Sequence, residues 1–231
     1  MRKSIFAVSI LLAAVVVKAT VATAASVTVM LHNITDGQTL SRPIYGVGPC
    51  GVTTMFNEGK IASVALEQMA EGGISSPLVT FLQSKGWKVL LGPGTILGNN
   101  SQTMTITVPS MTATQHPCIA VISMLVPTND GFIALQDLYL FGGYALRWMY
   151  VPAYDAGTEY NDELCASIPT AIGYTYGTCP VNGQGFNSTK PWPRERTVTA
   201  HKGLHGRGNL KPADSGFNPE RPAKLMFWYN P

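Results

Sequence analysis

Eight short segments of this sequence have the composition of β-strands, and this pattern constrains the fold more than any other feature. In the first segment, Val27, Val29 and Leu31 alternate with Thr28 and Met30, the period of two expected of a strand with one buried face. The eight segments are 27–31, 87–91, 104–108, 119–126, 132–140, 145–151, 196–201 and 223–229. Glycine and proline punctuate nearly every gap between them. The pattern predicts an all-β antiparallel sandwich or barrel rather than βαβ units.

Helical patterns are confined to one short insertion near the N-terminus. Segment 61–71 carries apolar residues at helical spacing and ends at Gly72-Gly73, where glycine can adopt the left-handed cap conformation. A second helix is predicted over 77–85, with Ser76 as its N-cap, Pro77 at its first position and Gly86 at its end.

The first 24 residues have the order of an export signal. Arg2 and Lys3 precede an apolar run, and the small residues 22–24 form an A-x-A-like cleavage site. The apolar run spans only about 13 residues, short of the roughly 20 that a membrane anchor needs. We therefore expect a secreted mature chain, 25–231, that forms one domain and contains no transmembrane segment.

The charge of the chain argues against nucleic acid as a partner. The formal net charge is +3, but three of the 16 basic residues lie in the predicted leader, and the remaining 13 balance the 13 acidic residues. A mature chain without excess positive charge has no overall field that attracts phosphate backbones.

Export to an oxidising compartment predicts that the four cysteines form two disulfides. The residues are Cys50, Cys118, Cys165 and Cys179, and three pairings are open. Closeness in sequence favours Cys165–Cys179, which leaves Cys50–Cys118. Zinc is the weaker alternative, because no C-x-x-C pair supplies ligands at the usual spacing.

Charge is distributed unevenly along the chain. Six acidic residues lie between Asp130 and Glu163 against Arg147 alone, whereas eight basic residues lie between Lys190 and the C-terminus against three acidic ones. One interpretation is that these are solvated loops of opposite sign that lie near one another. The other is that the acidic residues converge on a cation.

Three acidic residues form the best candidate for such a cation site. Asp155 and Glu159 are separated by Ala-Gly-Thr, so a tight turn around Gly157 can aim both carboxylates at one point, and Asp130 lies in another loop that follows a predicted strand. Oxygen ligands on flexible loops suit Ca²⁺, which takes six to eight oxygens, whereas Mg²⁺ requires a stricter octahedron. The spacing does not match an EF-hand.

Five blocks, spread over nearly the whole mature chain, carry a family resemblance. They are NITDGQ (33–38), FNEGKIAS (56–63) with Leu66 and AEG (70–72), 123–135, YDAGTE (154–159) and HKGLHGRG (201–208). In this order they resemble the spondin domain family, the N-terminal module of F-spondin and mindin, which also occurs alone in secreted microbial proteins. The thrombospondin repeats that follow the module in F-spondin are absent from this sequence.

The resemblance implies a C2-like antiparallel β-sandwich that holds calcium in loops at one end and acts through extracellular contacts rather than catalysis. The calcium carboxylates of the family fall on Asp130, Asp155 and Glu159. Position 159 is more often Asp in the animal members; the longer Glu can reach the ion with a shifted loop or through water. Asn209 replaces an expected acidic residue, so we assign the 201–208 block a structural role.

Weaker signals leave alternatives open. His201 and His205 have the spacing of helical metal ligands, but the glycines between and after them favour a turn with hydrogen-bonded or exposed histidines. Phe227-Trp228-Tyr229 is predicted to lie in the final strand, where exposure would make it an adhesive patch.

The sequence leaves three functional classes: a calcium-dependent module that contacts an extracellular protein or matrix component, a C2-type binder of lipid surfaces, and a metal-dependent hydrolase. The first is the main expectation.

Overall fold

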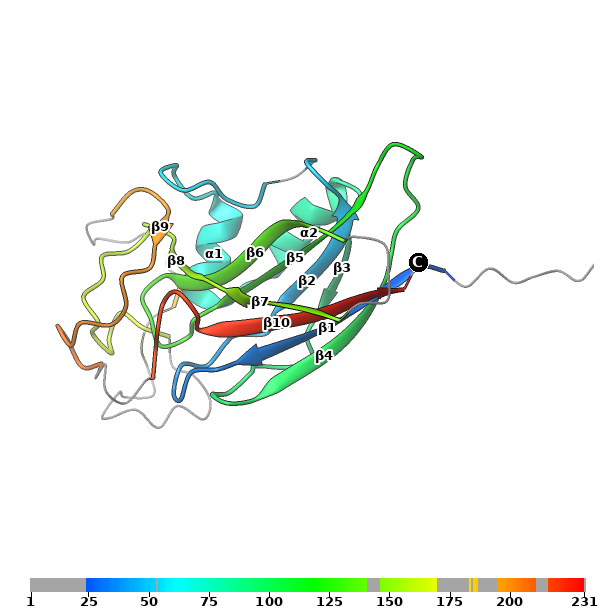
Figure 1. The fold of residues 1–231 in the computed structure, drawn as a ribbon. Helices are drawn as coiled ribbons and strands as arrows, with labels where there is room; N and C mark the ends of the chain where they lie inside the picture. Colours follow the sequence, from blue (N-terminus) through cyan, green and yellow to red (C-terminus); the bar gives the residue numbers. More distant parts are fainter. Residues whose placement is uncertain are drawn as a thin grey trace, which may run out of the picture.

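A computed structural model describes residues 24–52, 54–140, 146–169, 183, 185–186, 195–210 and 216–230. These residues form two antiparallel sheets packed face to face, with two short helices on one side (Figure 1). The all-β sandwich predicted from the strand pattern is confirmed. The predicted leader, 1–24, lies outside the described residues except for Ala24. Within the described chain, no helix is both long enough and apolar enough to cross a membrane.

The smaller sheet has four strands and joins the two ends of the described chain. Its order is β4 (Ser101–Thr107), β1 (Ser26–Asn33), β10 (Ala223–Asn230) and β7 (Arg147–Val151). Strands β1 and β10 pair along their whole length, from Ser26 opposite Asn230 to Asn33 opposite Ala223.

The larger sheet has six strands and carries the candidate site. Its order is β3 (Lys88–Leu91), β2 (Ile44–Pro49), β5 (Pro117–Met124), β6 (Gly131–Tyr139), β8 (Ala153–Asp155) and β9 (Thr199–Ala200). All of its pairings are antiparallel.

The core between the sheets follows from the alternation in the sequence. Val27, Val29 and Leu31 point inward from β1 and are fully buried, as the period of two predicts. They pack in one cluster with Tyr45 and Ile119 of the larger sheet. Full burial of an aliphatic side chain contributes about 1.5–3 kcal/mol, so this layer is a main source of stability.

A second core lies on the other face of the larger sheet. Helices α1 (Val64–Gly72) and α2 (Ser76–Ser84) cover this face, and Leu66 of α1 and Leu82 of α2 pack in one cluster with Phe132 of β6. Strand β5 is therefore covered on both faces, which explains its continuous apolar sequence.

The predicted C-terminal end of α1 is confirmed, but α1 begins at Val64, after the N-cap Ser63, rather than at 61. Gly73 adopts φ +64° after α1, which confirms the predicted left-handed glycine cap. The prediction that Ser76 caps α2 is wrong: Ser76 is already helical, and the cap residue Ser75 makes no side-chain capping bond. Pro77 lies within the first turn, where its missing N–H has no intrahelical acceptor to lose.

Two strands of the larger sheet, β2 and β8, were not predicted from the sequence. Strand β2 (IYGVGP) has the composition of a turn, but Gly46 and Gly48 make room for Trp87: a Cβ on Gly48 would lie 2.4 Å from the indole. Strand β8 begins directly after Pro152, where the chain leaves the smaller sheet for the larger one. The strand predicted over 196–201 is shortened to β9.

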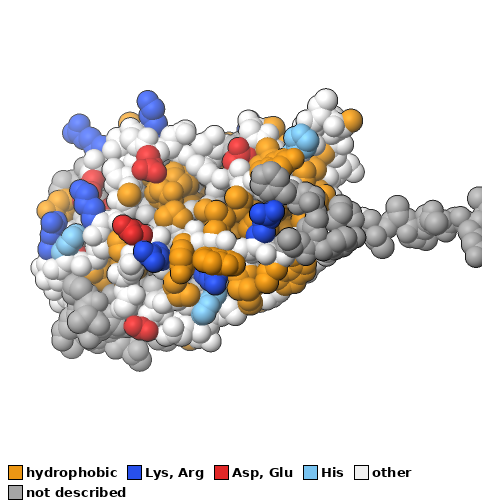
Figure 2. All heavy atoms as spheres, viewed as in Figure 1, with side chains coloured by type: hydrophobic (Ala, Val, Ile, Leu, Met, Phe, Trp, Pro, Cys, Tyr) orange, Lys and Arg blue, Asp and Glu red, His pale blue; other side chains and the backbone are white. Residues whose placement is uncertain are grey.

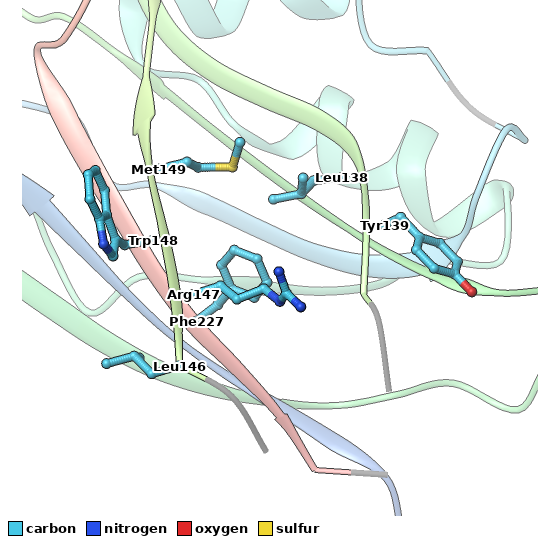
Figure 3. Close-up of a pocket in the computed structure, with 7 residues that line it drawn as sticks. All are labelled: Leu138, Tyr139, Leu146, Arg147, Trp148, Met149 and Phe227. Carbon is cyan, nitrogen blue, oxygen red and sulfur yellow. The ribbon is translucent and has the colours of Figure 1, made fainter. Parts of the chain in front are cut away.

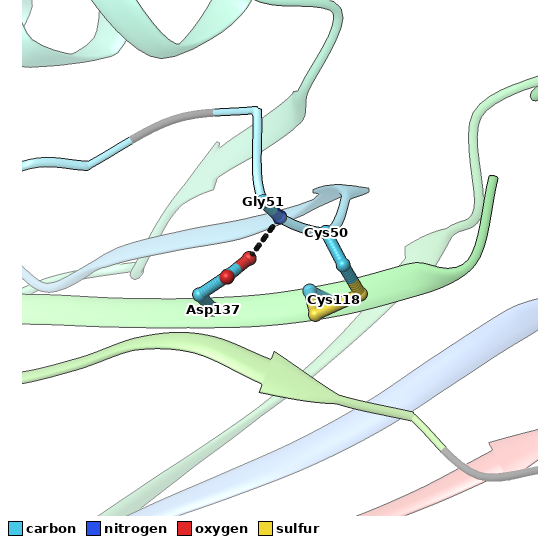
Figure 4. Close-up of a disulfide and its surroundings, with 4 residues drawn as sticks. All are labelled: Cys50, Gly51, Cys118 and Asp137. Atoms are coloured by element: carbon cyan, nitrogen blue, oxygen red, sulfur yellow. Dashed lines mark hydrogen bonds between the residues drawn. A yellow bond between two sulfur atoms is a disulfide. The ribbon is translucent and has the colours of Figure 1, made fainter.

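One predicted disulfide is present at the end of the sandwich away from the acidic loops. Cys50 and Cys118 are bonded, with 5.0 Å between their Cα atoms, and connect the end of β2 to the start of β5 (Figure 4). The backbone N–H of Gly51 donates a hydrogen bond to Asp137 beside it, at 2.8 Å. Cys165 is buried, and its predicted partner, Cys179, lies outside the described residues.

Candidate metal site in the acidic loops

Two neighbouring strands bring the candidate ligands to the same end of the larger sheet. Asp130 immediately precedes β6, and Asp155 ends β8; the two strands pair with Gly131 opposite Asp155. The loop then continues through Glu159, and the N–H of Ala156 donates to the carbonyl of Asp130 at 3.2 Å. The side chains of Asp130, Asp155 and Glu159 are all buried.

The carboxylate of Asp130 organises the loop after β8. Its Oδ2 accepts hydrogen bonds from the backbone N–H groups of Thr158 at 2.7 Å and Glu159 at 3.0 Å, and from the Thr158 hydroxyl at 3.1 Å. Its Oδ1 is also buried but has no hydrogen-bond partner among the described residues. A buried carboxylate oxygen without a donor is costly unless a cation or water supplies the missing interaction.

Asp155 is fixed by a turn that requires glycine. Its Oδ1 accepts from the N–H of Gly157 at 2.7 Å, and its Oδ2 accepts from the side-chain amide of Asn161. Gly157 has φ +68°, and a Cβ at this position would lie 2.3 Å from the carbonyl oxygen of Thr197. The turn predicted around Gly157 is present, and the tertiary structure shows that the backbone of Thr197 occupies the space beside it.

Burial and mutual repulsion disfavour negative charge in this cluster. The pKa of Asp130 is raised well above its usual range, first by burial and then by the nearby negative charges of Asp155 and Glu159, against which its backbone hydrogen bonds act. The pKa of Asp155 is raised mainly by burial, and hydrogen bonds from Asn161 and Gly157 offset part of that effect. A bound cation would reverse the balance by favouring the ionised forms.

The three carboxylates are the kind of ligand that suits a calcium ion, but their oxygens lie farther apart than the ligand atoms of a compact metal site. In the described chain, the only three His, Cys, Asp or Glu ligand atoms that lie within 4.8 Å of one another come from Cys50, Cys118 and Asp137, and the two sulfurs there are already bonded to each other. The three loop carboxylates are therefore not drawn together that closely. Calcium sites commonly include water among their ligands, which relaxes the distance between protein oxygens.

Two other acidic residues of this region, Asp162 and Glu163, are held by partners of their own. Glu163 accepts hydrogen bonds from the backbone N–H groups of His205 at 2.5 Å and Arg207 at 2.7 Å. Asp162 accepts from the side-chain amide of Asn129 at 3.0 Å and the hydroxyl of Ser167 at 2.7 Å. The acidic and basic segments thus meet here, and Glu163 holds the glycine-rich 201–208 loop in place.

The 201–208 block makes hydrogen bonds within itself and to the acidic segment. The Nδ1 of His201 accepts from the N–H of Gly203 at 2.9 Å, and His205 is exposed, as predicted for histidines in a turn. Asn209 accepts from the N–H of Cys165 at 3.0 Å. Burial, and to a lesser degree His205, lowers the pKa of His201 to about 4, so this imidazole is neutral at physiological pH.

The fold and the loops define an antiparallel β-sandwich with a buried acidic cluster at one end. A scan against protein-family models finds no match, and a search of curated proteins finds no related sequence.

Proposed function

We propose that this protein is a secreted, non-catalytic binding module of the spondin type, in which one Ca²⁺ ion orders the acidic loops that contact an extracellular protein or matrix component. The observation that carries the proposal is the buried Oδ1 of Asp130, which lies beside Asp155 and Glu159 and has no hydrogen-bond partner within the described part of the chain. The disulfide between Cys50 and Cys118 supports an oxidising compartment.

The chemistry of the cluster supports calcium as the ion. Asp130, just before β6, and Asp155, at the end of β8, would supply hard carboxylate oxygens, and Glu159 would supply a third carboxylate whose extra methylene extends its reach. Burial without a counter-ion makes the ionised forms of Asp130 and Asp155 unfavourable, and a divalent ion beside them would favour those forms.

The hydrogen bonds of the cluster support an ordering role for the ion rather than a catalytic one. Both oxygens of Asp155 and one oxygen of Asp130 accept hydrogen bonds from the surrounding loop. An ion bound there would connect the start of β6, the end of β8 and the loop after it. The loop surface at this end of the sandwich would then be fixed in one conformation for a partner.

The test compares melting temperatures in calcium and in chelator for the wild type, Asp130→Asn and Asp137→Asn. Asp137 is the matched control, because it is an acidic residue beside the disulfide at the other end of the sandwich. Calcium should raise the melting temperature of the wild type and Asp137→Asn but not of Asp130→Asn, because an ion that binds only the folded state stabilises it by mass action. Titration calorimetry should give one ion per chain. Identical melts of the wild type in calcium and chelator would refute the proposal.

A further inference from the structure

The outer face of the smaller sheet carries a group of aromatic and sulfur-containing side chains, of which Trp148 and Tyr150 are exposed and the others are partly exposed. We call it the aromatic face; its members are Met30, Trp148, Tyr150, Met226 and Trp228. Strand register places them side by side: Met226 lies opposite both Met30 and Trp148. Figure 2 shows hydrophobic side chains gathered over β1, β10 and β7, with basic side chains among them.

These side chains are not required by the core. Along β10, Leu225 and Phe227 point inward and are buried, whereas the alternate residues point outward. On β7, Trp148 is 55% exposed and Tyr150 is 40% exposed, and Leu146, which precedes the strand, is 55% exposed. Contiguous exposure of this kind marks an interaction surface in a soluble protein.

The face combines aromatic rings with positive charge. The Nζ of Lys224 lies 4.2 Å from the ring centroid of Trp148, and the guanidinium of Arg221 lies 5.5 Å from that of Tyr150. None of the four strands of the sheet contains Asp or Glu. The nearby Glu220 lines a different cavity, together with Glu58 and Tyr154. The complementary partner is therefore anionic.

The edge of the sheet beside the aromatic face is also apolar. A cavity of about 360 Å³ opens between β7 and the end of β6; its lining includes Leu138, Met149 and Phe227, and the side chain of Arg147 lies next to them (Figure 3). Trp148 and Leu146 belong to the lining as well. Apolar surface thus continues from the outer face around the edge strand.

We infer that the aromatic face docks on an anionic lipid bilayer, independently of calcium. Trp and Tyr side chains partition into the interface of a membrane, and Lys and Arg near it are attracted by anionic headgroups. A second copy of the chain, docked through the same face, would place its Lys224 and Arg221 near those of the first copy, and the like charges would repel. A polysaccharide would need an open ring face for stacking, but Lys224 lies over one face of Trp148, and the exposed Leu146 and the partly exposed methionines suit acyl chains better.

The experiment measures co-sedimentation with vesicles of phosphatidylcholine alone or mixed with phosphatidylserine, always in excess chelator. The wild type should sediment with the mixed vesicles, and its tryptophan emission should shift to the blue. Lys224→Gln should weaken binding about five-fold, the contribution of one basic residue at such a surface. Trp148→Ala should also weaken binding and reduce the blue shift. Unchanged melting temperatures show that the variants are folded.

Phe81→Ala is the matched control. Phe81 on α2 is partly exposed, and the Nζ of Lys85 lies 5.9 Å from its ring centroid. The two residues therefore form a cation–π pair on another surface. This variant and Asp130→Asn should bind vesicles like the wild type, which separates the inference from the calcium proposal. No binding to anionic vesicles in chelator would overturn the inference. So would an equal loss in Phe81→Ala, dimerisation that Trp148→Ala abolishes, or binding to a soluble acidic polysaccharide but not to vesicles.

Discussion

The Oδ2 atom of Asp130 accepts a hydrogen bond from the backbone N–H of Glu159 at 3.0 Å, so two of the proposed ligand residues are joined through the loop without an ion. Oδ2 of Asp130 also accepts from the N–H of Thr158, whereas its Oδ1 has no hydrogen-bond partner in the part of the chain that the structure describes. The same residue therefore connects local folding to the proposed ion site, which makes its protonation state the first point to test.

The calcium effect should depend on pH. Both Asp130 and Asp155 have raised pKa values in the fold without an ion, so protons bind them more tightly in the folded chain than in the unfolded one. Proton binding by the two aspartates therefore stabilises the fold below the pKa that they have in the unfolded chain. This stabilisation is lost as the pH rises through the pKa values that they have in the folded chain. Calcium competes with these protons, so its increment in melting temperature should be larger at about pH 8 than at about pH 5. Calorimetric melts measure this increment; an increment independent of pH would contradict the prediction.

Replacing Gly157 with alanine should destabilise the protein far more than replacing Gly59. Both glycines have positive φ, at +68° and +76°, but only Gly157 has backbone in the way, that of Thr197. Gly59→Ala should cost about 1 kcal/mol from backbone conformation alone. Gly157→Ala should cost at least about 2 kcal/mol more, because the clash forces the loop apart. Urea unfolding followed by circular dichroism measures both values, and equal losses would show that the contact with Thr197 is unimportant.

Glu163→Gln should loosen the 201–208 loop. The carboxylate accepts two backbone N–H bonds, from His205 and Arg207, and glutamine keeps only one acceptor oxygen and loses the charge. We expect a loss of about 2 kcal/mol in the free energy of unfolding. Hydrogen exchange of these two amides should speed up. The exposed Glu220, replaced by Gln, serves as the control and should change neither quantity.

His201 should make the fold sensitive to mild acid. Its pKa falls from 6.5 to about 4 on burial. The neutral imidazole therefore contributes stability that is present above the unfolded pKa and is lost as the pH falls from 6.5 towards 4, by up to about 3 kcal/mol. Subtracting the pH profile of His201→Leu from that of the wild type isolates this contribution from the opposite effect of the aspartates. Parallel profiles would refute the assignment.

Local patterns in the sequence were sufficient where neighbouring residues determine the conformation. The alternation in 27–31 predicted β1, because a strand with one buried face needs a period of two. Gly73 predicted the end of α1, because glycine adopts the left-handed cap without strain. The same logic placed the turn at Gly157.

The tertiary structure decided everything that depends on residues distant in the chain. Strand β2 has turn-like glycines, and only the ring of Trp87 packed over them explains why they lie in a sheet. Asp130 and Glu163 are both acidic loop residues in the sequence, yet Asp130 keeps a buried oxygen without a hydrogen-bond partner among the residues that the structure describes, whereas Glu163 accepts from the 201–208 loop. Which acidic residue is available to an ion depends on which donors surround it, and strand pairing between distant segments brings those donors together.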